Sequence, residues 1–208
     1  MCDINAELIE RWNTDDLPFF EPQLDEYFRK AKHELGNIEF TTDVDRSILQ
    51  ADVIFISVNT PPMQVAASLS IAPSVMNDQA AGNAASERHP IEKVSLGVQT
   101  DMRAFYSVVQ QIGKVVSKRV SEIKKDNSKA IHKILVEKST VPLGTAKQMH
   151  KLLSEAVQNV DSLFTIVNMP EFLAEGSAIA DLVSPQRVVI GTKSDNAFTL
   201  MRKLSVGS

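Results

Sequence analysis

The chain has 208 residues, a formal net charge of −4 and a hydrophobic fraction of 43%, which suit one large α/β domain with an ordinary core. Its lysines and arginines form no long block, so nothing indicates nucleic-acid binding or a polybasic membrane patch. No apolar run approaches the ~20 residues of a membrane span, and acidic residues stand where a signal peptide needs basic ones. The one cysteine, Cys2, excludes an internal disulfide. We therefore expect a cytoplasmic protein.

The first part of the chain alternates short helical and extended patterns. Taken in order, the patterns predict a helix capped by Asn5, a helix near 24–31, a strand at 38–42, a helix capped by Asp43 and a strand at 53–58. The last of these, VIFISV, is a continuous apolar run, which is typical of a parallel strand buried on both faces. Residues 63–95 then lose any clear period, and we interpret them as a mobile insertion. A poorly patterned helix is the alternative.

Regular patterns resume after the insertion. They predict a helix at 101–117, a strand at 131–136, a helix opened by Pro142, strands at 163–167 and 187–190, and a helix from 196 to 204. Strands that alternate with helices favour a parallel sheet with helices on both faces. Ligands of such sheets bind beyond the carboxyl ends of the strands. The residues that follow each predicted strand are therefore the candidates for a site.

Four segments stand at such positions. Asp3 could accept hydrogen bonds from a ribose, although a surface acid is the commoner case. The NTPP segment that follows VIFISV offers polar groups, or it only ends the strand. In EKSTVP, Ser139 and Thr140 precede a helix start that favours a negative ligand group, or one of them is an ordinary cap.

The fourth segment is PEFLAEG. If it is helical, Glu171 and Glu175 lie one turn apart and could act as a general base and a polar clamp. A solvated acidic face is the alternative, which the apolar residues between the two glutamates weaken.

Together these segments resemble a known family. The ordered run DIN, LPFFEP, ADVIFISVNTP, EKSTVP, PEFLAEG and DLVSPQRVVIG is similar to the N-terminal domain of UDP-glucose 6-dehydrogenases and related UDP- and GDP-sugar dehydrogenases. The resemblance runs from Asp3 to about Leu204. It implies NAD as cofactor and UDP-glucose, or a similar nucleotide sugar, as substrate.

The resemblance also implies roles for individual positions. Catalytic roles fall to Glu171 and to Thr140, which helps to position a water. Cofactor contacts fall to Asp3, Val58, Asn59, Thr60, Pro61, Pro62, Ser139, Thr140, Val141 and Glu175. Contacts with the sugar nucleotide fall to Glu171, Phe172, Leu173, Ala174 and Glu175. No metal site is expected.

The chemistry of the family explains these residue types. A primary alcohol is oxidised to a carboxylate in two hydride transfers to NAD, through a thioester on a cysteine that water then hydrolyses. A glutamate such as Glu171 would be the base for hydrolysis, and Thr140 would hold the water.

The chain also departs from the family pattern. No two of its eight glycines stand two residues apart, so the G-x-G-x-x-G turn is absent. We therefore expect an incomplete Rossmann-like, doubly wound parallel sheet that lacks its first strand, with a split sheet and exposed apolar edges. Residues 1–204 would be a partial NAD-binding domain and 205–208 a tail. Cys2 does not match the cysteine nucleophile of the family.

Two functions from different classes follow. In the first, the residues act within a complete dehydrogenase of UDP-glucose or of another nucleotide sugar, and the isolated chain is inactive. In the second, the chain is a non-catalytic relative that binds a complete enzyme. For complete members the resemblance implies a homo-oligomer assembled through a central helix that these 208 residues do not contain.

Overall fold

The computed structural model describes residues 1–63, 99–126 and 131–206 of the chain. They belong to two units, Met1–Thr60 with Met102–Ser208 and Pro61–Asp101. The insertion predicted at 63–95 lies outside the described residues, apart from Met63.

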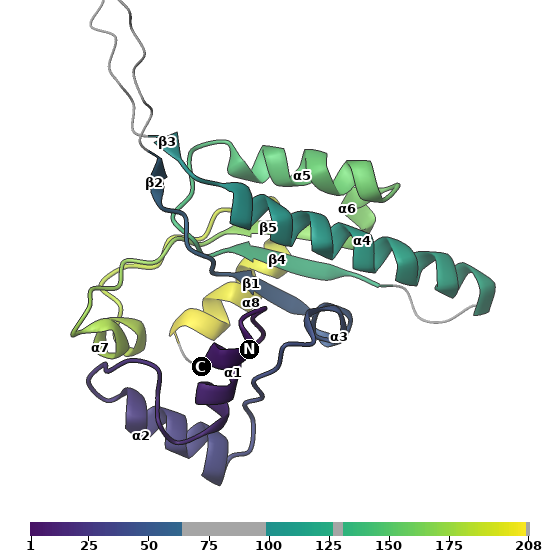
Figure 1. Ribbon diagram of the computed structural model, residues 1–208. Coiled ribbons are helices and arrows are strands. Elements are labelled where there is room, and N and C mark those ends of the chain that lie inside the picture. Colours follow the sequence, from purple (N-terminus) through teal and green to yellow (C-terminus); the bar gives the residue numbers. More distant parts are fainter. Residues whose placement is uncertain (64–98, 127–130, 207–208) are drawn as a thin grey trace, which may run out of the picture. The chain divides into compact units, whose positions relative to one another are not determined.

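A three-stranded parallel sheet forms the centre of the larger unit (Figure 1). Its strands are β1 (Val53–Ile56), β4 (Lys133–Glu137) and β5 (Phe164–Asn168), in the order β1-β4-β5. The predicted parallel α/β architecture is confirmed. However, β1 is an edge strand and 47% of Phe55 is exposed, so the prediction that this run is buried on both faces was wrong. The central strand β4 takes the buried position.

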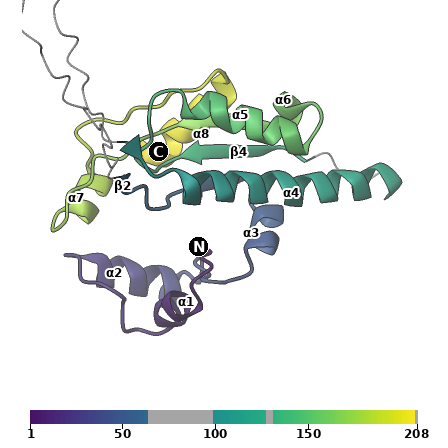
Figure 2. The ribbon, with the colours of Figure 1, turned by 45° about the horizontal axis from the view of Figure 1, so that its top comes forward.

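Helices pack on both faces of this sheet (Figures 1 and 2). Successive strand residues point to opposite faces, so Leu135 and Val136 enter different cores. Leu135 packs with residues of α4 (Arg103–Asp126) and α5 (Thr145–Ala156), whereas Val136 packs with residues of α8 (Asp195–Val206). Three short helices complete this region, namely α3 (Val44–Gln50), α6 (Val160–Leu163) and α7 (Ala178–Val183).

Residues 1–42 form what we call the N-terminal lobe. It contains α1 (Ala6–Asn13) and α2 (Leu24–Arg29), which continues as the π-helical turn η1 (Lys30–Glu34). Aromatic rings hold the lobe together, with Trp12 stacked on Phe40 at 5.2 Å between ring centroids. This cluster is separate from the two cores of the sheet.

Two predicted helix caps are confirmed. The amide of Leu8 donates to Oδ1 of Asn5 at 3.1 Å, and the amide of Arg46 donates to Oδ1 of Asp43 at 3.0 Å. The helix expected to open at Pro142 instead begins at Thr145, because Gly144 adopts a left-handed conformation (φ +91°) just before it.

Two predicted strands are reduced to single bridges. The segment 38–42 pairs only through a parallel bridge between Thr41 and Cys2, and 187–190 leads only to an antiparallel bridge between Gly191 and Asn168. Neither segment runs beside a neighbour long enough to build a ladder. The Cys2–Thr41 bridge is not part of the three-stranded sheet, and among the described residues no strand pairs with the outer edge of β1.

The smaller unit contains a two-stranded antiparallel ribbon of β2 (Pro62–Met63) and β3 (Gln99–Thr100). The amide of Asp101 extends it by donating to the Pro61 carbonyl at 2.8 Å. Across both units, none of the helices that can be described combines the length and apolarity needed to cross a membrane.

Candidate functional site

The loops that follow β1 and β4 are tied together by side-chain hydrogen bonds. Ser139 Oγ accepts from the Val58 amide at 2.9 Å and donates to the Val58 carbonyl at 2.7 Å. Thr60 Oγ1 donates to the Thr140 carbonyl at 2.7 Å. Because parallel strands end at the same edge of a sheet, these bonds join two predicted site segments into one surface.

The two neighbouring hydroxyls of this surface differ in availability. Ser139 is buried, and its hydroxyl is already engaged with Val58. Thr140 is exposed, and its hydroxyl makes no hydrogen bond to any described residue. Ser139 therefore shapes the loop, while Thr140 is the hydroxyl that can meet a ligand.

At the end of β4, a buried carboxyl is hydrogen-bonded to the last residue of the neighbouring strand β5. Glu137 is 1% exposed, and its Oε2 accepts from Asn168 Nδ2 at 2.8 Å. Its Oε1 has no partner among the described residues. Burial raises the pKa of this carboxyl, and the bond from Asn168 opposes the rise. The Met169 amide donates to the Glu137 carbonyl at 3.0 Å, which continues the strand pairing into the next loop.

Thr140 and Glu171 follow the paired ends of β4 and β5 by the same number of residues. The last residue pair between β4 and β5 is Glu137 with Asn168. Thr140 and Glu171 each stand three residues beyond their own member of that pair. Both are exposed. A hydroxyl and a carboxylate thus follow adjacent strand ends, which is where parallel sheets bind ligands.

The PEFLAEG segment is not helical, so the idea that Glu171 and Glu175 face each other across one turn was wrong. Residues 171–174 have no regular structure and turns follow at 175–177, because Pro170 and the left-handed Gly176 (φ +85°) bracket the segment. The two glutamates are exposed. The apolar residues between them are also exposed, and Arg187 stacks over the Phe172 ring at 4.1 Å.

The other predicted residues fall in three different places. Asp3 belongs to the Cys2–Thr41 bridge, and its Oδ1 accepts from the Asn5 amide at 2.8 Å. Pro61 and Pro62 belong to the smaller unit. Asn59 is exposed and Val141 half-buried, on the two joined loops.

Three charged residues that make buried or long-range contacts were given no role by the sequence reasoning. Glu137 and Lys133 are charged residues in an otherwise apolar strand, a signal that could have marked both. Burial lowers the pKa of Lys133, although the Asp52 carboxylate opposes this, and its Nζ donates to the carbonyls of Leu49 and Ala51. Glu21, in LPFFEP, contacts the segment after PEFLAEG from the other end of the chain. Nothing in the local sequence around Glu21 signals that contact.

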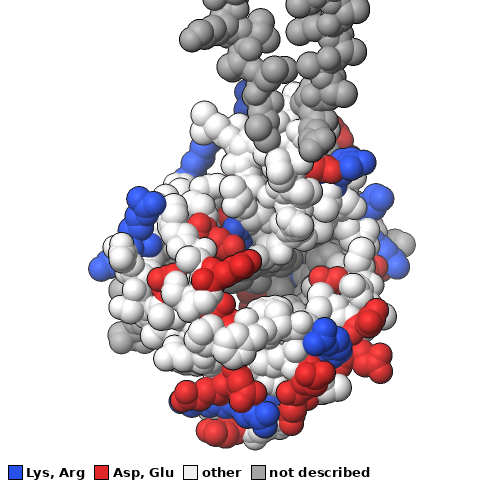
Figure 3. Space-filling view, turned by 60° about the vertical axis from the view of Figure 1, so that its left-hand side comes forward, with Lys and Arg blue, Asp and Glu red and all other residues white. Residues whose placement is uncertain are grey.

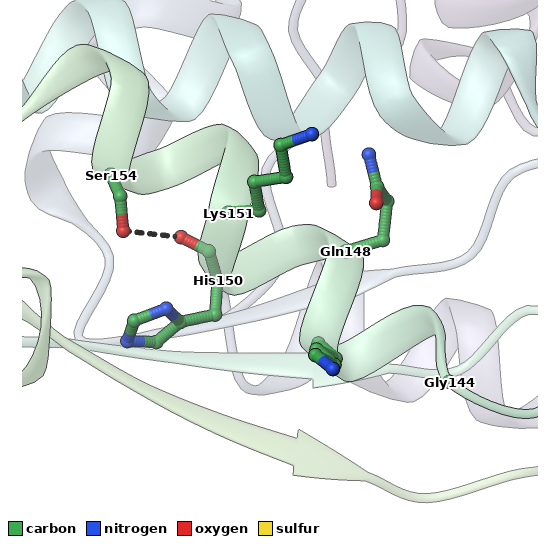
Figure 4. Close-up of a pocket in the computed structure, with 6 residues that line it drawn as sticks. Gly144, Gln148, His150, Lys151 and Ser154 are labelled. Carbon is green, nitrogen blue, oxygen red and sulfur yellow. Dashed lines mark hydrogen bonds between the residues drawn. The ribbon is translucent and has the colours of Figure 1, made fainter.

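An open hollow of about 620 Å³ lies along α5 between Gly144 and Ser154, but Figure 4 shows Lys151 and His150 pointing to different sides of the helix. The face shown in Figure 3 is hollowed near its middle, and acidic side chains border the hollow. No cluster of His, Cys, Asp and Glu suited to a metal ion occurs in the part of the chain that the structure describes.

Comparisons with known proteins identify the family of the chain. The sequence pattern of the UDP-glucose/GDP-mannose dehydrogenase family, NAD binding domain, matches residues 1–205. UDP-glucose 6-dehydrogenase 4 of Arabidopsis thaliana is 35% identical over 191 residues, 92% of this chain and 31% of that protein. The UDP-glucose 6-dehydrogenase of Caenorhabditis elegans is 34% identical over 195 residues, 93% of this chain and 32% of that protein. The chain thus spans about a third of the length of these curated relatives.

Solved structures show the same fold. A UDP-glucose dehydrogenase from Pyrobaculum islandicum superposes with a TM-score of 0.68 at 24% identity, over 96% of this chain and 36% of that one. A GDP-mannose dehydrogenase from Pseudomonas aeruginosa gives a TM-score of 0.69 at 23% identity, over 98% and 37%. The chain belongs to the UDP-glucose/GDP-mannose dehydrogenase family of NAD-dependent nucleotide-sugar dehydrogenases, and it comprises the NAD-binding domain of that family.

Proposed function

We propose that this chain supplies one wall of the NAD site and the sugar-contacting segment of an enzyme that oxidises UDP-glucose to UDP-glucuronate. The observation that carries the proposal is the register of β4 and β5, which sets Thr140 and Glu171 at corresponding positions beyond adjacent strand ends. The 35% identity to a UDP-glucose 6-dehydrogenase supports this substrate over other nucleotide sugars.

The residues present suit the ribose and carboxamide groups of NAD. The Thr140 hydroxyl and the exposed Asn59 amide can meet ribose hydroxyls or a carboxamide, and Asp3 keeps one carboxylate oxygen beyond its bond to Asn5. A pyrophosphate is different, because it requires a glycine-rich turn at a helix start and the sequence has no such motif. NAD, when bound, accepts the hydride. The joined loops of β1 and β4 would orient it.

Glu171 and Thr140 would serve the hydrolytic half of the reaction. A carboxylate that has no hydrogen-bond partner among the described residues can accept a proton from a water, and a neighbouring hydroxyl can orient that water. The segment Glu171–Glu175 would contact the sugar nucleotide, with Phe172, Leu173 and Ala174 between the two carboxylates. Glu175 would also reach NAD.

The isolated 208-residue chain should not turn over UDP-glucose. Its only thiol, Cys2, is exposed beside Asp3 and belongs to the Cys2–Thr41 bridge rather than to the Thr140 surface. No steady increase in NADH absorbance is expected with UDP-glucose and NAD, and steady turnover would contradict this account. Calorimetric titration should likewise detect weak NAD binding or none, because the pyrophosphate cradle is absent.

Ligand binding tests the proposal more directly. Saturation-transfer NMR should detect contact between the chain and UDP-glucose at millimolar concentration, with GDP-mannose as the competing nucleotide sugar. Glu171→Gln should weaken the signal. Glu155→Gln is the matched control, because Glu155 is exposed on α5. An equal signal from both variants, or a stronger one with GDP-mannose, would overturn the assignment.

Within the ranges that the structure describes, the outer edge of β1 is unpaired, which favours a second candidate, a non-catalytic relative that pairs with a complete dehydrogenase. Strand edges that expose apolar side chains such as Phe55 are prone to pair with another chain. Co-elution of the chain with a complete dehydrogenase of the same organism, lost on Phe55→Lys, would favour this function. Independent elution would exclude it.

A further inference from the structure

The segment 171–177 carries both candidate carboxylates, Glu171 and Glu175, yet it has no regular structure of its own. Every residue in it is exposed, so burial does not fix its position. Its conformation therefore depends on individual contacts from outside. The position of the two carboxylates depends on the same contacts.

Two of these contacts come from residues close by in the chain. Arg187 stacks over the ring of Phe172 at 4.1 Å. Asp181 Oδ2 accepts from Ser177 Oγ at 2.8 Å and from the Ala174 amide at 3.4 Å. Asp181 lies in α7, directly after the segment, and fixes the internal shape of the segment. Arg187 precedes Val188 and Ile190, which pack on the α8 face of the sheet, so its ring contact ties one side of the segment to the sheet.

The third contact comes from the opposite end of the chain. Glu21 Oε2 accepts from the Gly176 amide at 3.0 Å, and Glu21 Oε1 accepts from the Ala178 amide at 2.8 Å. The partners are 155 and 157 residues apart in sequence. The Glu21 carboxylate of the N-terminal lobe thereby binds the amides at the end of the segment and at the start of α7. Amides at a helix start have no partner within the helix, so they favour an anion.

From this arrangement we infer that Glu21 is a positioning residue, which holds the segment 171–177 and through it the carboxylates of Glu171 and Glu175. The importance of Glu21 for catalysis rests on the proposed function. The hydrogen bonds by which Glu21 holds the segment do not depend on that function. Glu21 does not reach the reacting groups in this role. It links the N-terminal lobe to the ligand-binding edge of the sheet.

A carboxylate suits this role better than its nearest substitutes. Each of its two oxygens accepts one of the two amides, and charged acceptors form stronger hydrogen bonds than neutral ones. Glutamine offers one acceptor oxygen and an NH₂ group that would face an amide donor. Aspartate keeps both oxygens on a side chain that is one methylene shorter. Glu21→Gln should therefore release the segment more fully than Glu21→Asp.

Amide hydrogen exchange on the 208-residue chain tests the inference without any ligand. In Glu21→Gln, the amides of Gly176 and Ala178 should exchange about tenfold faster, as expected when hydrogen bonds to a charged group are lost. Glu21→Asp should give an intermediate rate. Glu26→Gln is the matched control, since Glu26 is an exposed acid of α2 in the same lobe. Unchanged exchange in Glu21→Gln would overturn the inference.

A second measurement needs no variant, so it holds even if Glu21→Gln unfolds the lobe. A long-range HNCO experiment on the wild-type chain should correlate the Glu21 carboxyl carbon with the amides of Gly176 and Ala178. Absence of both correlations would contradict the inference. Failure of UDP-glucose to shift residues 171–175 while these correlations persist would instead refute the proposed function alone.

Discussion

The core between the sheet and helices α4 and α5 contains several fully buried side chains, whereas the aromatic cluster of the N-terminal lobe is smaller and contains none among the described residues. Phe105 and Leu135 are fully buried, while Phe28, Phe40 and Trp12 retain 4%, 7% and 9% of their exposure. The loops that carry Thr140 and Glu171 follow β4 and β5, two strands of this sheet. The lobe contributes Asp3 and Glu21. The comparison teaches that the loops of the candidate site follow strands of the larger core, while a smaller packing unit contacts one of these loops through Glu21.

The largest effect should come from truncating one phenylalanine in each region. Phe105→Ala should lower the free energy of unfolding by about 3–5 kcal/mol, because it leaves a cavity in a closed core. Urea unfolding followed by far-UV circular dichroism should show the loss. Phe28→Ala should mainly move the fluorescence transition of Trp12, the only tryptophan and a neighbour of Phe28 at 5.8 Å. Equal shifts of the dichroism transition in Phe105→Ala and Phe28→Ala would contradict the difference between the two regions.

The next effect concerns the connection between β4 and the end of α3. Lys133→Met should lower the free energy of unfolding by about 2 kcal/mol, because the carbonyls of Leu49 and Ala51 lose a charged donor at a helix C-terminus. Chemical denaturation measures this loss. Lys147→Met is the control, since Lys147 is exposed on α5. A loss that is no larger than that of the control would show that the buried ammonium contributes little.

A smaller effect should separate the two hydroxyls of the site. Ser139→Ala should cost about 1–2 kcal/mol, because the Val58 amide and carbonyl lose their partner. Thr140→Val should change stability by less than about 0.5 kcal/mol, since the hydroxyl is exposed. Thermal unfolding of the two variants provides the comparison. A larger loss of stability in Thr140→Val than in Ser139→Ala would place Thr140, rather than Ser139, in the structural role.

A change in pH dependence is the most subtle expectation. Burial raises the folded-state pKa of Glu137, so its contribution to stability is complete below the unfolded pKa and is lost as the pH rises through the folded value. Glu137→Gln removes this titration. Between pH 4 and pH 8 the variant should therefore lose less stability than the wild type, and Glu155→Gln should not. Parallel stability profiles for wild type and Glu137→Gln would refute this assignment.

Much of the sheet region could be predicted from the sequence, because apolar runs and helical periodicity are local properties. The strands β1, β4 and β5 and the helix α8 were predicted within a few residues, whereas α4 begins near its predicted start but runs nine residues past the predicted end at 117. The edge position of β1 was not, since pairing partners are not encoded in one run. The short α6 and α7 carry too few residues for a period to emerge.

The candidate site likewise contains residues that local sequence patterns indicate and contacts that they do not indicate. The positions of Ser139, Thr140 and Glu171 in the loops after β4 and β5 were predictable, because polar residues follow apolar runs there. The contact of Glu21 with Gly176 spans 155 residues, and no local pattern indicates it. The single bridge at Thr41 also depends on a distant partner, Cys2.

The central claim is that Thr140 and the segment Glu171–Glu175 form one ligand surface at the carboxyl ends of β4 and β5. Protein-observed NMR of the ¹⁵N-labelled chain, titrated with UDP-glucose to millimolar concentration, tests it directly. The account predicts that the amides of Thr140 and of residues 171–175 shift together, while those of the α5 hollow stay unchanged. Shifts confined to α5, or no shifts at either strand end, would contradict it.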